Sequence, residues 1–231
     1  MSKRHPGARR VAHNTSHGDE DAFIAGILQA GNWTRANQQM LTIAGIVVVL
    51  VIAVVVYMGN VREAAADEAA RRLDEIHGMV AFQDPEGATR ALVLFVDQFG
   101  GTPYGGEGRL LLGDLYLRSG QADKAVAVLE PLGKSPRSPL ELQAGVLLGA
   151  AYEENGDADE AETVYLRVGD RSELDFEVRG ALANAARLRA QRGDVAGAVE
   201  LYDRVIDTFE ESAPGRSVYE MRRQELLVAM G

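Results

Sequence analysis

The chain has 231 residues, no cysteine, and 34 acidic against 24 basic side chains, which gives a formal net charge of −10. Without cysteine it can form neither disulfides nor cysteine metal sites. The acidic balance argues against nucleic acid as a partner, since phosphates are bound by surfaces rich in Lys and Arg.

The first 38 residues fall into two parts. Residues 1–18 are basic and lack hydrophobic periodicity, so we expect a disordered arm. Residues 19–38 form a short amphipathic segment with acidic residues at its start, and its apolar helical face consists of Phe23, Ile24, Ile27 and Leu28. This segment is either a contact face for a membrane surface or a partner protein, or a polar lead-in that extends the next helix.

Residues 41–58 contain no charge, and 11 of these 18 residues are β-branched. A helix of 18 residues rises about 27 Å, close to the hydrocarbon thickness of a bilayer. Trp33 and Tyr57 stand at opposite ends of the stretch, where aromatic rings favour the headgroup region. We therefore predict one transmembrane helix over residues 39–59, with the lipid bilayer as its environment.

A cleaved signal peptide is the alternative interpretation of this stretch. Its apolar core would be shorter and would follow a short basic start. Here some 40 residues come first, and the only small-residue site, Ala64-Ala65-Ala66, lies behind Arg62 and Glu63. The pattern favours an uncleaved anchor.

The charges on either side of the span predict its orientation. Residues 1–58 carry five basic and three acidic side chains, whereas the remainder carries 19 basic and 31 acidic ones. Because Lys and Arg in short flanking segments tend to stay in the cytoplasm, we expect a cytoplasmic N-terminus and a domain of residues 60–231 on the other side. Arg62, Arg71 and Arg72 oppose this assignment.

Residues 61–78 are rich in strong helix formers and contain no proline. We expect the transmembrane helix to continue through them into the domain without a flexible linker. Such a continuous helix would hold the domain in a fairly fixed orientation to the bilayer.

The domain contains a repeated pattern of small and aromatic residues. One copy recurs 36 residues later with five of six positions identical. The two copies are Leu112, Gly113, Tyr116, Gly120, Ala125, Leu129 and Leu148, Gly149, Tyr152, Gly156, Ala161, Tyr165. A third copy keeps Gly193, Ala198 and Tyr202 but has Ala185-Ala186 for Leu-Gly and Arg189 for the aromatic residue. A divergent fourth copy precedes them, with Ala91 and Phe95 placed 34 residues before Ala125 and Leu129.

This pattern resembles the tetratricopeptide repeat, in which each unit is a pair of antiparallel helices. The resemblance implies an all-α chain: one transmembrane helix followed by a solenoid of about three to four helix pairs. We place the units at about 61–104, 105–139, 140–177 and 178–214. A last helix over 215–231, with Val218, Met221, Leu226 and Leu227, would cap the array.

The repeated positions have physical roles in such a unit. Gly113 and Gly149 would let the two helices approach closely, with the facing small surface formed by Ala125, Ala161 and Ala198. Left-handed glycines would end the first helix at Gly120, Gly156 and Gly193. Two side chains would cap the second helix, those of Asp157 and Asp194. The gap between units would be filled by Tyr116 and Tyr152.

The layout of residues 19–230 resembles a narrower group of bacterial proteins, in which a cytoplasmic arm, one span and a tetratricopeptide-like periplasmic domain are joined. The ancillary subunits of the Sec translocon are examples, and the segment 95–120 has the look common in bacterial envelope repeat proteins. This resemblance implies the bacterial inner membrane, a periplasmic domain, and a binding or scaffolding role without catalytic residues.

The residues themselves offer little catalytic chemistry. No H-E-x-x-H spacing is present, and the glycine-rich stretch 100–106 lacks the Lys-Ser/Thr of a phosphate loop, so we expect a flexible loop between units there. The carboxylates of Glu153, Glu154, Asp157 and Asp159 would form a solvated face. We expect no enzyme, no cofactor, no metal and no small-molecule substrate.

Two functions fit these expectations. The first is a non-catalytic, membrane-anchored scaffold or structural subunit that binds subunits of a larger integral-membrane complex, such as a translocon or a respiratory or photosynthetic assembly. The alternative is a periplasmic chaperone or assembly factor that binds clients transiently in the repeat groove.

Overall fold

The computed structural model describes residues 37–82 and 84–230, which form helices and turns without a strand. Trp33 and the apolar face of Phe23, Ile24, Ile27 and Leu28 lie outside the described residues. The chain divides into two compact units, Met1–Asn60 and Val61–Gly231. The predicted all-α class is confirmed, and the repeat array belongs to the second unit.

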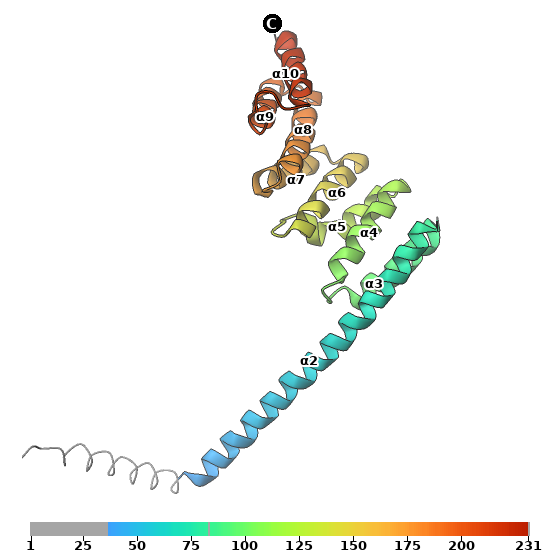
Figure 1. Cartoon of the computed structure of the whole chain (residues 1–231), viewed down its shortest axis with the longest axis vertical. Helices are drawn as coiled ribbons and strands as arrows, with labels where there is room; N and C mark the ends of the chain where they lie inside the picture. Colours follow the sequence, from blue (N-terminus) through green and yellow to red (C-terminus); the bar gives the residue numbers. More distant parts are fainter. Residues whose placement is uncertain (1–36, 83, 231) are drawn as a thin grey trace, which may run out of the picture. The chain divides into compact units, whose positions relative to one another are not determined.

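Helix α2, Gln38–Ala81, is one continuous helix of 44 residues, so the helix predicted over 61–78 does extend the apolar stretch (Figure 1). Between Ile43 and Met58 its large apolar side chains are exposed. The most apolar 18-residue window of α2 has a mean hydropathy of 3.0, and no described residue buries it. By length and composition, α2 is able to cross a membrane.

The second unit is a stack of antiparallel helices that follow one another in chain order (Figure 1). The last part of α2 packs with α3, and each later helix packs on the next. These helices are α3 Pro85–Phe99, α4 Gly105–Arg118, α5 Ala122–Gly133, α6 Pro139–Asn155, α7 Ala158–Arg171, α8 Asp175–Gln191, α9 Val195–Asp207 and α10 Arg216–Met230.

The apolar core runs along the stack in two clusters. The first joins α2, α3 and α4, and the second continues from α4 and α5 through α9. Tyr116 and Val128 pack against both clusters and so connect them. Because each helix pair buries its faces only against its neighbours, the stack is stable as an array rather than as separate units.

The structure changes the register of the first, divergent copy. In the later units, an alanine lies four positions after the residue that precedes the second helix. These alanines are Ala125, Ala161 and Ala198, and each is fully buried. In α3 this position is Ala88, also fully buried, and not Ala91 as predicted. The prediction placed Ala91 at this position because Ala91 and Phe95 have the same spacing as Ala125 and Leu129 and also lie on apolar faces of α3.

The glycine-rich stretch is shorter as a loop than predicted. Only residues 100–104 connect α3 to α4, while Gly105 and Gly106 lie inside α4. The turn is tight, because a Cβ on Gly105 would lie 2.5 Å from the carbonyl oxygen of Gly100. Arg109 fixes it further by donating from Nη1 to the same oxygen at 2.9 Å.

The last helix packs through only some of the residues predicted for it. In α10, Val218 and Met221 are about half exposed (50% and 55%) and do not face the core. Tyr219 does, with its ring centroid 6.4 Å from that of Tyr202 and 5.6 Å from that of Phe209. Leu226 also packs against the core, so α10 closes the array with its Tyr219 face.

We expect residues 61–231 to fold without the rest of the chain, because the core of this unit is formed within it. Circular dichroism of this fragment should show a helical spectrum with a cooperative thermal transition. A spectrum of unfolded chain, or a transition without cooperativity, would show that the array depends on residues before 61.

Candidate interaction surface

The two helices of a unit approach most closely where the first helix has no side chain. A Cβ on Gly113 would lie 2.5 Å from Cγ of Leu129, and one on Gly149 would lie 2.5 Å from Cε1 of Tyr165. The side chains that pack against these two glycines are therefore Leu129 and Tyr165, and not the predicted Ala125 and Ala161. In the third copy Ala186 and Tyr202 have the same spacing, and both are buried.

The turns between paired helices follow the prediction in part. Gly120, Gly156 and Gly193 all have positive φ, as the left-handed ends of first helices require. Asp194 caps α9 by accepting from the backbone N–H of Gly197 at 3.0 Å.

Asp157 precedes α7 but makes no such capping bond. Instead its Oδ2 accepts from Nδ2 of Asn155 at 2.5 Å. A cap that sequence alone did not indicate is Asp84, which accepts from the N–H of Gly87 at 2.8 Å and so starts α3.

Tyr152 connects two neighbouring units, as the gap-filling role predicted. Its hydroxyl donates to Oε1 of Glu130 on α5 at 3.4 Å, and Nζ of Lys134 donates to the same oxygen at 2.5 Å. The lysine lowers the pKa of Glu130, and burial raises the pKa of the Tyr152 hydroxyl. Tyr116 is half-buried between α3 and α5, with Nζ of Lys124 5.6 Å from its ring centroid.

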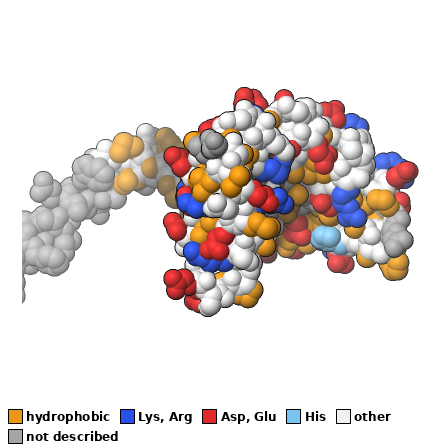
Figure 2. Space-filling view, turned by 90° about the horizontal axis from the view of Figure 1, so that it is seen from above, with side chains coloured by type: hydrophobic (Ala, Val, Ile, Leu, Met, Phe, Trp, Pro, Cys, Tyr) orange, Lys and Arg blue, Asp and Glu red, His pale blue; other side chains and the backbone are white. Residues whose placement is uncertain are grey.

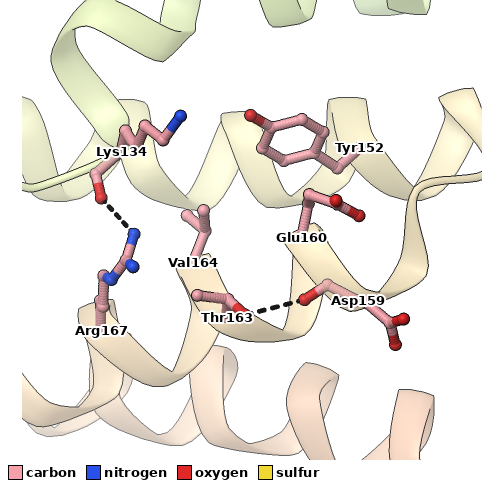
Figure 3. Close-up of a pocket in the computed structure, with 7 residues that line it drawn as sticks. All are labelled: Lys134, Tyr152, Asp159, Glu160, Thr163, Val164 and Arg167. Atoms are coloured by element: carbon pink, nitrogen blue, oxygen red, sulfur yellow. Dashed lines mark hydrogen bonds between the residues drawn. The ribbon is translucent and has the colours of Figure 1, made fainter.

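A shallow pocket lies beside this contact (Figure 3). Lys134 and Tyr152 line one side, and α7 lines the other with Glu160, Val164 and Arg167. Arg167 Nη1 donates to the backbone oxygen of Lys134 at 2.7 Å, so α7 is held against the preceding unit. The pocket is mixed in charge and largely open, as expected for a seam between repeats rather than an enclosed ligand site.

Glu153 is not part of a solvated face, which corrects the prediction for this carboxylate. Nη2 of Arg187 on α8 donates to both of its oxygens, at 2.7 and 2.6 Å, and the Tyr165 hydroxyl donates to Oε1 at 2.9 Å. Burial and the nearby carboxylate raise the pKa of Tyr165. Three consecutive helices are therefore connected by one polar network.

Arg189, which replaces the repeated aromatic residue, takes part in a second network. Its Nε donates to Oε1 of Glu162 on α7 at 2.7 Å, and Arg192 bonds the other oxygen of Glu162 and also Asp159. Glu162 is the one charged side chain among residues 37–82 and 84–230 that is classed as buried, at 8% exposed. Sequence reasoning missed it, because its partners come from another helix and no local motif marks the pairing.

The surface beyond these networks carries many charged side chains. Figure 2 shows acidic and basic side chains interspersed on the face that it displays, with hydrophobic side chains between them. Outside the apolar part of α2, most of the large exposed apolar residues lie near the two ends of the array, among them Leu94 on α3 and Val218 on α10, while Leu174 and Phe176 are exposed at the start of α8. Within the described part of the chain, no group of three or more His, Cys, Asp and Glu is placed to hold a metal.

Comparison with known proteins agrees with this geometry. A family model described as a tetratricopeptide repeat-like domain matches residues 32–227. The chain belongs to the tetratricopeptide repeat-like domain family. The family fold is one that binds protein partners, so this repeat protein is a protein-interaction module.

Solved structures show the same fold. One is the crystal structure of nearly identical TPR-like repeats described as a Podosopora anserina kinesin light chain. It is 22% identical to this chain, with a TM-score of 0.55, and the match covers 71% of this chain and 93% of that one. A variant of the same protein gives the same values. None of the curated protein sequences matches the chain.

We expect Gly149→Ala to destabilise this repeat domain by about 1–3 kcal/mol, because its Cβ would collide with the Tyr165 ring. Gly180→Ala is the matched control, since it also lies inside a helix but has no atom within 4 Å of an added Cβ. The control should gain up to about 1 kcal/mol from helix propensity. Chemical denaturation of both variants measures the difference, and equal stabilities would contradict the close-approach assignment.

We expect Glu162→Gln to cost about 1–3 kcal/mol, because it removes the carboxylate that holds two guanidinium groups in a largely buried place. Asp159→Asn removes another partner of Arg192, but Asp159 has an 83% exposed side chain and should change stability by less than about 1 kcal/mol. Thermal melts of the two variants provide the comparison. A larger loss for Asp159→Asn would show that the buried network is not the stabilising one.

Proposed function

We propose that this protein is a non-catalytic, single-span scaffold or structural subunit of an integral-membrane complex. α2 anchors it in the bacterial inner membrane, and its repeat domain binds and stabilises other subunits in the periplasm. The layout shared with ancillary Sec translocon subunits makes a translocon one candidate assembly, beside respiratory and photosynthetic complexes.

One observation carries this proposal: a single helix joins an unburied apolar stretch to an array of protein-binding repeats. Soluble proteins rarely expose a contiguous apolar surface as large as the one on α2 between Ile43 and Met58. Lipid removes that surface from water without any protein cover. The anchor therefore concentrates the repeat domain at the membrane, where integral-membrane partners lie.

The distribution of exposed residues favours a subunit over a chaperone that binds many clients in a groove. Such a chaperone needs an adaptable apolar surface. In the middle of the array the seams are instead occupied by ion pairs, such as Glu153 with Arg187 and Glu162 with Arg189. The exposed apolar side chains near the ends suit fixed contacts with particular partners.

The charge difference across the span supports a cytoplasmic N-terminus and a periplasmic repeat domain. A C-terminal fusion to alkaline phosphatase should therefore be active, because this enzyme folds to its active form only outside the cytoplasm. The control is a cytoplasmic reporter at the same end, which should be inactive. The reverse pattern would contradict the orientation.

We expect an unrelated span of equal length in place of residues 41–58 to leave co-purification of the partner complex largely intact. The reason is that the repeat domain supplies the specific contacts. Deleting residues 91–231 should abolish co-purification while leaving the protein in the membrane. Both variants are compared by mild detergent extraction and quantitative mass spectrometry. Loss of the complex on the span exchange alone would place recognition inside the bilayer.

A further inference from the structure

One face of each second helix packs against the preceding unit. Seven positions after the residue that precedes the helix, this face carries Val164 in α7 and Leu201 in α9, which are 2% and 3% exposed. Three positions further, Arg167 and Arg204 reach back to the preceding second helix. Arg167 bonds the backbone of Lys134, and Arg204 Nη2 donates to Asp170 at 2.6 Å.

In α3 the same two positions are Ala91 and Leu94. No helix pair precedes α2 and α3 within the described residues, and Leu94 is 70% exposed. The face that receives a helix in each later unit is therefore uncovered in the first one. Leu94 also stands where α7 and α9 have arginine, so the occupant meets an apolar contact where those two helices bond a carbonyl or a carboxylate.

This face is hollowed into an apolar groove between α2 and α3. Its floor is formed by Ile76, Phe95 and Phe99, which are buried, and its edges by Met79 and Leu94, which are exposed. We call these five residues, together with the charged rim described next, the terminal groove. On α2 its lining runs from Glu68 to Met79, about 17 Å at the rise of an α-helix, which matches about three turns of a docked helix.

The rim of the terminal groove is acidic. On α2 the Arg72 guanidinium is shared between two carboxylates, with Nε 3.0 Å from Glu68 and Nη1 3.3 Å from Glu75. Over α3 and the part of α2 beyond residue 60, the chain carries seven acidic and four basic side chains. A partner with Lys or Arg beside its apolar stripe complements this rim.

A second copy of the chain does not complement it. Two chains anchored in one membrane pair with parallel helices about a two-fold axis. Such a pairing through this face would set the acidic rim of one copy against the acidic rim of the other, and like charges across an interface are unfavourable.

We propose that the terminal groove receives one amphipathic helix of a different protein, which has an apolar stripe and flanking Lys or Arg and takes the place of a preceding repeat's second helix. This inference deepens the proposed function and rests on it, since it assigns the surface that contacts the membrane complex.

Photo-cross-linking of the full-length protein in its native membrane tests the groove. A photo-reactive residue replaces Leu94, and in the control it replaces Val218, an exposed apolar residue of α10. The probe at 94 should form one dominant cross-link to another protein. Mass spectrometry should map this link to a helical segment with the stated stripe and basic flanks. The probe at 218 should not form this link.

A substitution gives the second measurement. Leu94→Lys should lower co-purification of the mapped protein at least about tenfold, because a lysine would be buried in an apolar contact. Val218→Lys should leave it unchanged. Since both side chains are exposed, both variants should melt like the unchanged protein, which separates lost binding from lost folding.

The outcomes distinguish this inference from the proposed function. Cross-links from position 94 to a second copy, to residues 19–33 of the same chain or to lipid alone overturn the groove assignment. An intact complex that cross-links only through position 218 also overturns it, while the scaffold role stands. If the unchanged protein retains no complex at all, both proposals fail.

Discussion

The array depends on the approach of two helices at a position that has no side chain. The ring of Tyr165 and the side chain of Leu129 occupy the space that a Cβ at Gly149 or Gly113 would need. Bringing the backbones this close lets one large side chain fill the interior of each pair, as dense packing requires. The pairing thereby fixes which faces of the two helices remain outward, and those faces are the ones that stack on the neighbouring units.

Stacking then makes every unit depend on its neighbours. Within the array the seams combine apolar contacts with polar links that cross from one unit to the next, such as Arg187 to Glu153 and Arg204 to Asp170. Within residues 37–82 and 84–230 each end of the array has a neighbour on one side only, and the two ends differ. At the C-terminal end α10 covers the core through Tyr219. At the other end α2 and α3 leave apolar side chains uncovered, Leu94 above all.

Much of the fold could be predicted because the repeat places glycine where geometry demands it. Gly156 and Gly193 take the left-handed conformation at the ends of first helices. Small residues in the repeat likewise mark where the two helices of a unit approach closely. The register of α3 could not be predicted by spacing alone. Ala88 and Ala91 lie on neighbouring faces of one helix, and only the packed structure shows which of them meets α2.

The candidate surface was less predictable than the fold, for a physical reason. The role of Glu162 depends on two arginines from another helix, and the exposure of Leu94 depends on whether a neighbouring helix covers it, which none does among residues 37–82 and 84–230. Both depend on which residues are close in three dimensions, and neither produces a repeated pattern in the sequence. A residue pattern shows which face a helix buries, but it does not show whether anything is there to bury it.

The apolar part of α2 has few features by which a partner could select it. Helices associate in lipid through small residues that allow close packing or through polar groups that bond across the contact. Here the small residues Ala44, Gly45 and Ala53 form no G-x-x-x-G pair, and the Thr42 hydroxyl donates to the carbonyl of Gln38 in its own helix at 2.8 Å. What remains are Val and Ile side chains, which pack against lipid tails and other apolar helices alike. Selectivity must then come from residues that water surrounds, where charge and shape differ from one partner to another, and the repeat domain offers most of those.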